Sequence, residues 1–210
     1  MKTYVLWSGG YDSTLALARE CKDSSENNPI VVITIEHHNL FGIQYKAEKQ
    51  ARKRILKILK KKYYIEELEI NIDASQPSRA YSGWSQQVWW MTFSLPYIED
   101  GSEIVFGYCL GDEFWKFRRE HDQIIKYVSY IMGKKITIKY PLEFDNKETV
   151  LTELDNLKLV DYCWTCDSPI RVGRGFKSCG KCHKCKELKI MMEIMKEDNK
   201  DMGKEEKVKE

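Results

Sequence analysis

Short apolar runs recur through the first two-thirds of the chain and predict the strands of a β-sheet. They are rich in β-branched residues and are separated by polar segments, as buried parallel strands are. The runs lie at residues 4–7, 30–35, 68–72, 104–106 and 136–138. A longer segment, over about residues 45–62, has a helical period instead. Its apolar positions share one face and are Ala47, Ala51, Ile55 and Leu59, with lysines and arginines opposite.

The alternation of strands with helix-length segments predicts a doubly wound α/β fold with about five parallel strands. In such folds the crossovers are right-handed, and ligands bind beyond the carboxyl ends of the strands. We expect this domain to span residues 1–155. Residues 156–197 then form a small C-terminal subdomain, whose short helix covers about 187–197. The charged tail at 198–210 has no periodicity, so we expect it to be irregular.

The composition fits one globular unit with a small appendage. The chain has 210 residues, of which 42% are hydrophobic and 31% charged, enough apolar material for a packed core. The formal net charge of +2 argues against a nucleic-acid or anionic-membrane partner. The basic face of residues 45–62 is typical of the wet side of an amphipathic helix. No stretch approaches the ~20 apolar residues of a membrane span, and no signal peptide opens the chain, so we expect a cytoplasmic protein.

A glycine-rich loop directly follows the first predicted strand. Its residues are Ser8, Gly9, Gly10, Tyr11, Asp12, Ser13 and Thr14, and an apolar helical run comes next. The glycines allow a tight turn and close approach to a ligand, and the N-terminus of the helix attracts anions. The hydroxyl groups add donors, and Asp12 can either cap the helix or hold a magnesium ion. The pattern predicts a phosphate-binding loop; the alternative is a Gly-Ser turn closed by a capping serine.

Five of the seven cysteines crowd into residues 163–185. Cys179, Cys182 and Cys185 follow one another at two-residue spacings, the geometry of a zinc knuckle. A closed zinc site needs a fourth ligand, which either Cys163 or Cys166 can provide. Tandem C-x-x-C spacings also occur in ferredoxins, so iron–sulfur ligation is an alternative, and free core cysteines are another.

The glycine-rich loop resembles the S-G-G-x-D-S loop of the PP-loop ATP pyrophosphatases. In that superfamily the loop grips the pyrophosphate of ATP while a substrate oxygen attacks the α-phosphorus. The resemblance assigns to ATP binding the residues Ser8, Gly9, Gly10, Asp12, Ser13, Thr14 and Gly107. It also assigns catalytic roles to Asp12, to Asp112 as the carboxylate that organises Mg²⁺ and the pyrophosphate, and to Lys147. The last lies in a segment, residues 141–147, that resembles the family's P-L-x-x-x-x-K and opens a helix with its lysine.

With its cysteine knuckle, the whole chain resembles 7-cyano-7-deazaguanine synthase. The specific matches are Trp164-Thr165-Cys166, then Gly175-Phe176-Lys177, then the three spaced cysteines. The resemblance therefore implies that Cys166 completes a Cys₄ zinc site with Cys179, Cys182 and Cys185. It implies a ligase that uses ATP and Mg²⁺ to adenylate 7-carboxy-7-deazaguanine, or a related deazapurine, and converts it with ammonia to amide or nitrile. A homodimer is also implied.

The chain departs from that family where the substrate should bind. Residues 81–87 lack the family's Pro-Gly-Arg-Asn element, and residues 108–116 keep Asp112 in a different context. We expect Trp84 to stack on the substrate base and Trp89 and Trp90 to belong to the core. His37 and His38 follow the second predicted strand and are expected to be polar loop residues.

Two other functions remain open from the sequence. One is a PP-loop tRNA-modifying sulfurtransferase, in which Cys163 and Cys166 would be a catalytic pair. The modest charge and the missing RNA-binding domain argue against it. The other is a non-catalytic zinc-knuckle module that binds nucleic-acid phosphates through Arg171, Arg174, Lys177, Lys181 and Lys184.

Overall fold

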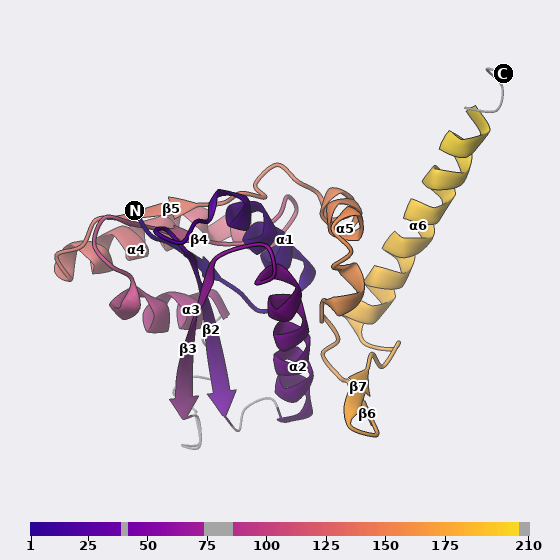
Figure 1. The fold of residues 1–210 in the computed structure, drawn as a ribbon, viewed down its shortest axis with the longest axis horizontal. Coiled ribbons are helices and arrows are strands. Elements are labelled where there is room, and N and C mark those ends of the chain that lie inside the picture. Colours follow the sequence, from indigo (N-terminus) through magenta and orange to yellow (C-terminus); the bar gives the residue numbers. More distant parts are fainter. Residues whose placement is uncertain (39–41, 74–85, 206–210) are drawn as a thin grey trace.

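A five-stranded parallel sheet forms the centre of the protein, between two layers of helices (Figure 1). The computed structural model describes residues 1–38, 42–73 and 86–205. The strands are β1 (Thr3–Leu6), β2 (Ile30–His38), β3 (Ile65–Asp73), β4 (Ser102–Val105) and β5 (Ile136–Lys139). The predicted α/β fold with about five parallel strands is confirmed.

The order of the strands places the glycine-rich loop at the switch point of the sheet. The order is β3-β2-β1-β4-β5, so the chain moves outward in one direction from β1 and then returns to its other side. Val5 in β1 is paired with Val32 of β2 and with Val105 of β4. Ligands of open α/β sheets bind beyond the carboxyl ends of the strands at this position. The loop that leaves β1 therefore lies where a nucleotide is expected.

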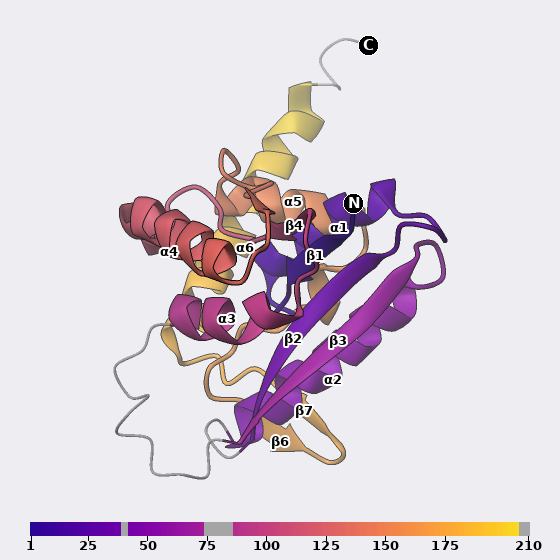
Figure 2. The same ribbon diagram turned by 90° about the vertical axis from the view of Figure 1, so that its left-hand side faces the viewer.

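Helices cover both faces of the sheet because both faces of its strands are apolar. The helices α1 (Tyr11–Glu20), α2 (Gly42–Leu59) and α5 (Lys147–Asn156) bury one face with Val5 and Trp7. On the other face, α3 (Gln86–Ser94) and α4 (Arg118–Ile131) pack over Tyr4 and Leu6 (Figure 2). None of the helices in the described ranges is long and apolar enough to cross a lipid bilayer.

The C-terminal part adds an antiparallel hairpin and a long helix to this body. The hairpin consists of β6 (Ile170–Val172) and β7 (Gly175–Lys177), and α6 runs over His183–Glu205. The predicted helix over 187–197 and irregular tail from 198 were therefore wrong in their bounds. Lysine, glutamate and methionine are good helix formers, Leu188 and Met191 pack against the core, and the Lys189–Glu193 ion pair adds support on the exposed side.

Other elements also differ from the sequence prediction. The strand β2 extends through His37 and His38, which were expected in the following loop. Trp90 packs against the core as predicted. The side chain of Trp89 and the whole of Trp84 lie outside the described residues. Short 3₁₀ turns complete the described fold, at η1 (Cys21–Asp23), η2 (Leu95–Tyr97), η3 (Glu113–Phe117) and η4 (Val160–Tyr162).

Candidate active site

The glycine-rich loop is held in shape by its own serines. Ser8 Oγ and Ser13 Oγ lie 2.9 Å apart, and both the Ser8 and Gly10 backbone N–H groups donate to these hydroxyls at 3.2 Å. Gly10 is the N-cap of α1 and makes no side-chain cap, so the first turn of α1 keeps free N–H groups directed at the loop. The arrangement is that of an anion seat formed before any ligand arrives.

Thr14 occupies a different place from the one predicted. Its side chain is fully buried, and Trp7 Nε1 donates to its hydroxyl at 3.0 Å beneath the loop. The hydroxyl was expected to contact phosphate, but it ties α1 to β1 instead. The reason is helical geometry, since Thr14 lies on the same side of α1 as the buried Leu17 and Ala18.

A buried ion pair supports the loop from below. Gly9 has a φ of 87°, a conformation that favours glycine, and a side-chain carbon there would come within 2.7 Å of Arg52 Cγ. Arg52, from α2, donates to Ser8 O at 3.2 Å and pairs with Glu36 of β2. Both charged side chains are almost completely buried. The sequence prediction missed this pair because Arg52 is indistinguishable from the basic residues around it on α2.

Gly107 has a packing role that the sequence did not indicate. A side-chain carbon at this position would lie 2.7 Å from Ser13 Cα and 2.9 Å from Ser13 N. The segment after β4 therefore approaches the start of α1 backbone to backbone. Only glycine permits this approach, so Gly107 brings the following residues, including Asp112, next to the loop.

The three predicted catalytic side chains meet at the mouth of the loop. Lys147 Nζ, at the start of α5, lies 2.5 Å from Asp12 Oδ2 and 3.3 Å from Asp112 Oδ1. Asn146 caps α5 by accepting from Thr149 N at 2.8 Å, which fixes where the lysine emerges. Asp12 stands in the first turn of α1 and does not cap it. Three segments that are far apart in the sequence thus supply two carboxylates and one ammonium group.

The electrostatics of this cluster leave one carboxylate oxygen unsatisfied. Burial raises the pKa of Asp12, although Lys147 opposes this effect. Burial disfavours the charge on Lys147, but the facing Asp12 carboxylate more than offsets it, and the pKa of the ammonium is raised. Asp12 Oδ1 is buried and accepts no hydrogen bond within the described residues. Because oxygen ligands suit Mg²⁺, an orphaned oxygen beside Asp112 fits a magnesium ion.

An arginine of α1 fixes the segment that carries Lys147. Arg19 donates to Asp145 at 2.6 Å, to Pro141 O at 2.9 Å and to Glu153 at 2.5 Å. Asp145 O in turn accepts from Leu110 N at 2.8 Å, which joins the loop bearing Asp112 to the same segment. The Arg19 network therefore fixes the two segments that bring Lys147 and Asp112 to Asp12.

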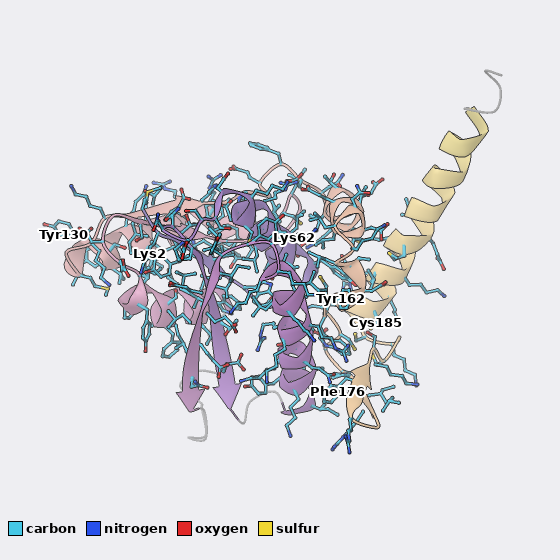
Figure 3. The ribbon with its side chains drawn as sticks, viewed as in Figure 1. Lys2, Lys62, Tyr130, Tyr162, Phe176 and Cys185 are labelled. Carbon is cyan, nitrogen blue, oxygen red and sulfur yellow. The ribbon has the colours of Figure 1, made fainter. Side chains whose placement is uncertain are left out.

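The four cysteines chosen through the family resemblance lie together. The sulfur atoms of Cys166, Cys179, Cys182 and Cys185 are all within 4.8 Å of one another, and two pairs are 4.0 Å apart. The N–H groups of Lys181 and Cys182 lower the pKa of Cys179 to about 6, which favours the thiolate that binds metals. Figure 3 shows Cys185 at the base of α6, close to the hairpin that carries Phe176.

The spacing of the sulfur atoms fits a single metal ion. Zinc–sulfur bonds of about 2.3 Å in a tetrahedron place the sulfur atoms about 3.8 Å apart. The observed pairs at 4.0 Å are close to that value. A four-iron cluster inserts iron and sulfide between the thiolates and therefore needs them farther apart. The four side chains are thus close enough together to bind a metal ion jointly.

Cys163 does not join this group. It is 9% exposed, lies in the core beneath α1 and donates to Leu159 O at 3.5 Å. Burial raises the pKa of its thiol to about 12, so it is a neutral core side chain at physiological pH. Cys163 lies in the core while Cys166 lies with the other three cysteines, so the geometry gives the catalytic pair considered from the sequence no support.

The cysteine segment is joined directly to the phosphate loop. Trp164 N donates to Gly9 O at 2.9 Å, and a side-chain carbon at Gly10 would lie 3.7 Å from Trp164 O. Trp164 Nε1 also donates to Cys166 O at 3.1 Å. One residue, Thr165, therefore separates the loop contact at Trp164 from Cys166.

Cys109 is a further side chain of the cluster that the sequence prediction did not include. Its sulfur lies within 4.8 Å of carboxylate oxygens of Asp12 and Asp112, and its backbone N donates to Asp112 Oδ2 at 2.9 Å. Burial raises the pKa of the Cys109 thiol to about 12, so it is present as the thiol. Its buried side chain therefore packs beside the two carboxylates.

The comparisons with known proteins support the fold. No family model and no curated protein matches the chain. Among solved structures, it is similar to the U34-tRNA thiolase NcsA from Methanococcus maripaludis with its [4Fe-4S] cluster. The identity is 16%, the TM-score is 0.52, and the match covers 76% of this chain and 58% of that one. The chain thus spans less than two-thirds of the thiolase's length, and what the likeness shows is a shared PP-loop fold.

Proposed function

We propose that this protein is an ATP pyrophosphatase that adenylates its substrate and releases pyrophosphate. The observation that carries the proposal is the meeting of Asp12, Asp112 and Lys147 at the mouth of a preformed anion seat. A structural turn needs no buried, unsatisfied carboxylate oxygen beside it. A site that receives a metal-bound polyphosphate does.

Each residue has a role that follows from its position. The N–H groups of the loop and of the first turn of α1 receive the β- and γ-phosphates. Asp12 and Asp112 would hold Mg²⁺, which supplies charge neutralisation at the phosphates when it is bound. Lys147 neutralises the charge that develops on the departing pyrophosphate. The Arg52–Glu36 pair keeps the loop in the geometry that these contacts need.

We infer that the four cysteines hold one structural zinc ion. Their sulfur spacing, close to that of a tetrahedral zinc site, supports this assignment. All four positions are filled by protein, which leaves none for a substrate. The ion would keep residues 164–185 folded against the loop, and the Trp164 contact would transmit that order to Gly9.

Thiolation of a tRNA base is the reaction class that the structural comparison favours. The similar protein is a U34-tRNA thiolase. In this chain, the proposed adenylation would activate a tRNA base so that sulfur can displace AMP. This support outweighs the support for the deazaguanine reaction. The burial of Cys163 constrains the source of sulfur. Its thiol pKa is raised to about 12, so a thiolase acting through this chain would not use Cys163 as a thiolate.

Conversion of a deazapurine carboxylate is the second candidate. It is supported by the Cys₄ group, which includes Cys166 of the Trp164-Thr165-Cys166 element. In this reaction the substrate carboxylate attacks the α-phosphorus, ammonia displaces AMP to give an amide, and a second activation gives the nitrile. The two candidates share the ATP chemistry and differ in the acceptor and the nucleophile.

The test measures AMP and pyrophosphate release from Mg-ATP with each acceptor. One arm contains bulk tRNA and sulfide, the other 7-carboxy-7-deazaguanine and ammonium, and mass spectrometry follows the modified base. Acceptor-dependent AMP in the first arm supports thiolation, and AMP with a nitrile in the second supports the deazaguanine reaction. ATP that is hydrolysed only to ADP, or not at all by folded protein, would overturn the proposal.

Metal analysis tests the second part of the proposal. Protein purified without oxygen is expected to hold one zinc ion per chain and no iron. It should therefore show no iron–sulfur absorbance band in the visible region. Several irons with inorganic sulfide per chain would overturn the zinc assignment and leave the adenylation proposal standing.

A further inference from the structure

Exposed positive side chains of α2 and of the cysteine subdomain lie around the contact between α2 and β7, and we name this region the hairpin surface. It comprises Lys46 and Lys53 of α2 and Arg171, Arg174, Lys177 and Lys181 of the cysteine subdomain. We propose that the hairpin surface binds the phosphate backbone of a folded RNA. The inference rests on the proposed function. It adds to that function the location of the surface that holds a macromolecular acceptor.

The hairpin itself carries an uncompensated charge. Between residues 168 and 186 the chain has no aspartate or glutamate, although it has six lysines and arginines there. Arg171, Arg174 and Lys177 are all exposed, and they sit on or between β6 and β7. A hairpin of this kind presents its cations on a short, rigid element rather than on a tail.

Helix α2 extends this charge. The hairpin packs beside α2, and a side-chain carbon at Gly175 would come within 3.8 Å of Gln50 Oε1. Lys46 and Lys53 lie four residues before and three residues after Gln50, so they share its helical face. Both are exposed. Figures 1 and 2 agree in placing β6 and β7 along α2.

Unlike Lys49 and Lys60, these cations have no acidic partners among the described residues. Among the described residues, Lys49 pairs with Glu69 and Lys60 with Glu67. The ion pairs of the described part of the chain include none to the six members of the hairpin surface; the neighbouring Lys184 pairs with Asp167 at 3.4 Å. Unpaired charge on one face is the electrostatic footprint of a polyanion site.

The position and chemistry of the surface favour RNA over other polyanions. The hairpin lies at the end of the molecule toward which β2 and β3 point (Figure 1). Ile170 and Val172 are 44% and 53% exposed and give the surface apolar ground between its charges. Splayed bases of a folded RNA pack on such ground while the phosphates meet the cations. Because the net charge of the chain is only +2, the electrostatic attraction for RNA is confined to the hairpin surface. A confined attraction favours binding in a single orientation.

The test compares two double variants that each remove one arginine and one lysine. Lys53→Ala/Arg174→Ala changes both elements of the hairpin surface, and Arg119→Ala/Lys126→Ala changes exposed residues of α4 on the far layer of the protein. Bulk tRNA is the probe. Its dissociation constant is measured by filter binding at KCl concentrations of about 50–200 mM. Zinc content and thermal midpoint are checked for each variant.

We expect the hairpin variant to bind tRNA about tenfold more weakly, with the slope of log K against log salt reduced by about 2. The α4 variant should match the unaltered protein. Equal loss in both variants, or no loss in either, would overturn the proposal. Tighter binding of the unaltered protein to anionic vesicles or polyglutamate than to tRNA would overturn it in favour of those partners.

The binding test does not depend on turnover. If tRNA binds through the hairpin surface but no AMP forms, the surface stands and the adenylation proposal fails. If AMP forms with the deazapurine while tRNA is not bound at all, the adenylation proposal stands and the RNA surface fails.

Discussion

The phosphate loop and the cysteine loop are two tight turns that touch each other but are held in different ways. The phosphate loop is fixed by the chain itself, through the Ser8–Ser13 contact, the support of Arg52 and the buried Thr14 beneath it. The cysteine loop has little core of its own, and apolar residues of its hairpin are exposed. Four thiolates around one ion, as proposed, would provide the cross-link that its packing lacks.

The difference teaches which parts of the site depend on ligands. A loop closed by side-chain hydrogen bonds, each worth about 1 kcal/mol, keeps its geometry when empty. A loop held by a metal loses its geometry with the metal. Because Trp164 N donates to Gly9 O, the second loop can weaken the first. The following predictions test how far the two are independent.

The largest effect is expected from Asp12→Asn. The change removes a carboxylate that would hold Mg²⁺ but keeps the shape of the side chain, so AMP formation should fall about 10²–10³-fold. Steady-state kinetics and circular dichroism check the rate and the fold. Asp23→Asn, an exposed position just beyond the other end of α1, is the matched control and should keep full activity. Full activity of Asp12→Asn would remove Asp12 from the site.

The support beneath the phosphate loop is tested with Arg52→Met. Glu36 is then left buried without its arginine partner, although Lys49 lies 3.7 Å away, which should cost about 3 kcal/mol of unfolding free energy. Urea unfolding measures the loss. Adding Glu36→Gln should restore most of the stability but not the affinity for ATP, because Ser8 O still lacks its donor. Recovery of both properties would show that Arg52 acts on stability alone.

The two kinds of cysteine should differ in reactivity once the metal is removed. At pH 7, Cys179 is mostly thiolate, since its pKa is about 6, while Cys163 and Cys109, with pKa values near 12, stay protonated. Iodoacetamide should therefore label Cys179 about 100-fold faster than either buried thiol. Peptide mass spectrometry follows the labelling. Equal labelling of Cys163 would mean that it is an accessible nucleophile, as the catalytic-pair hypothesis requires.

The smallest effect is expected where one loop acts on the other. Cys182→Ser should lose the metal and raise the KM for ATP about tenfold or less, with a smaller change in kcat, because Gly9 loses an ordered partner at Trp164. Cys21→Ala, which alters a buried cysteine outside the group, should keep one metal ion and an unchanged KM. An unchanged KM in the metal-free variant would show that the phosphate loop is independent of the cysteine loop.

The sequence predicted most of the strands because buried parallel strands are continuous apolar runs. It missed the polar ends of β2 and β3, where glutamates alternate with apolar residues on an edge. It placed Asp112 and Lys147 in the site only through the family resemblance. The structure brings both to Asp12, but whether they act in catalysis remains a prediction.

By itself, the sequence determined the order of strands and helices, the glycine-rich turn and the spacing of three cysteines. These features are local, and their periods and spacings are written along the chain. Only the tertiary structure decided that Cys166 joins the metal group while Cys163 enters the core, that Thr14 points inward, and that Arg52 supports Gly9. Each of these choices depends on which distant segment packs alongside, and that depends on the closure of the whole sheet.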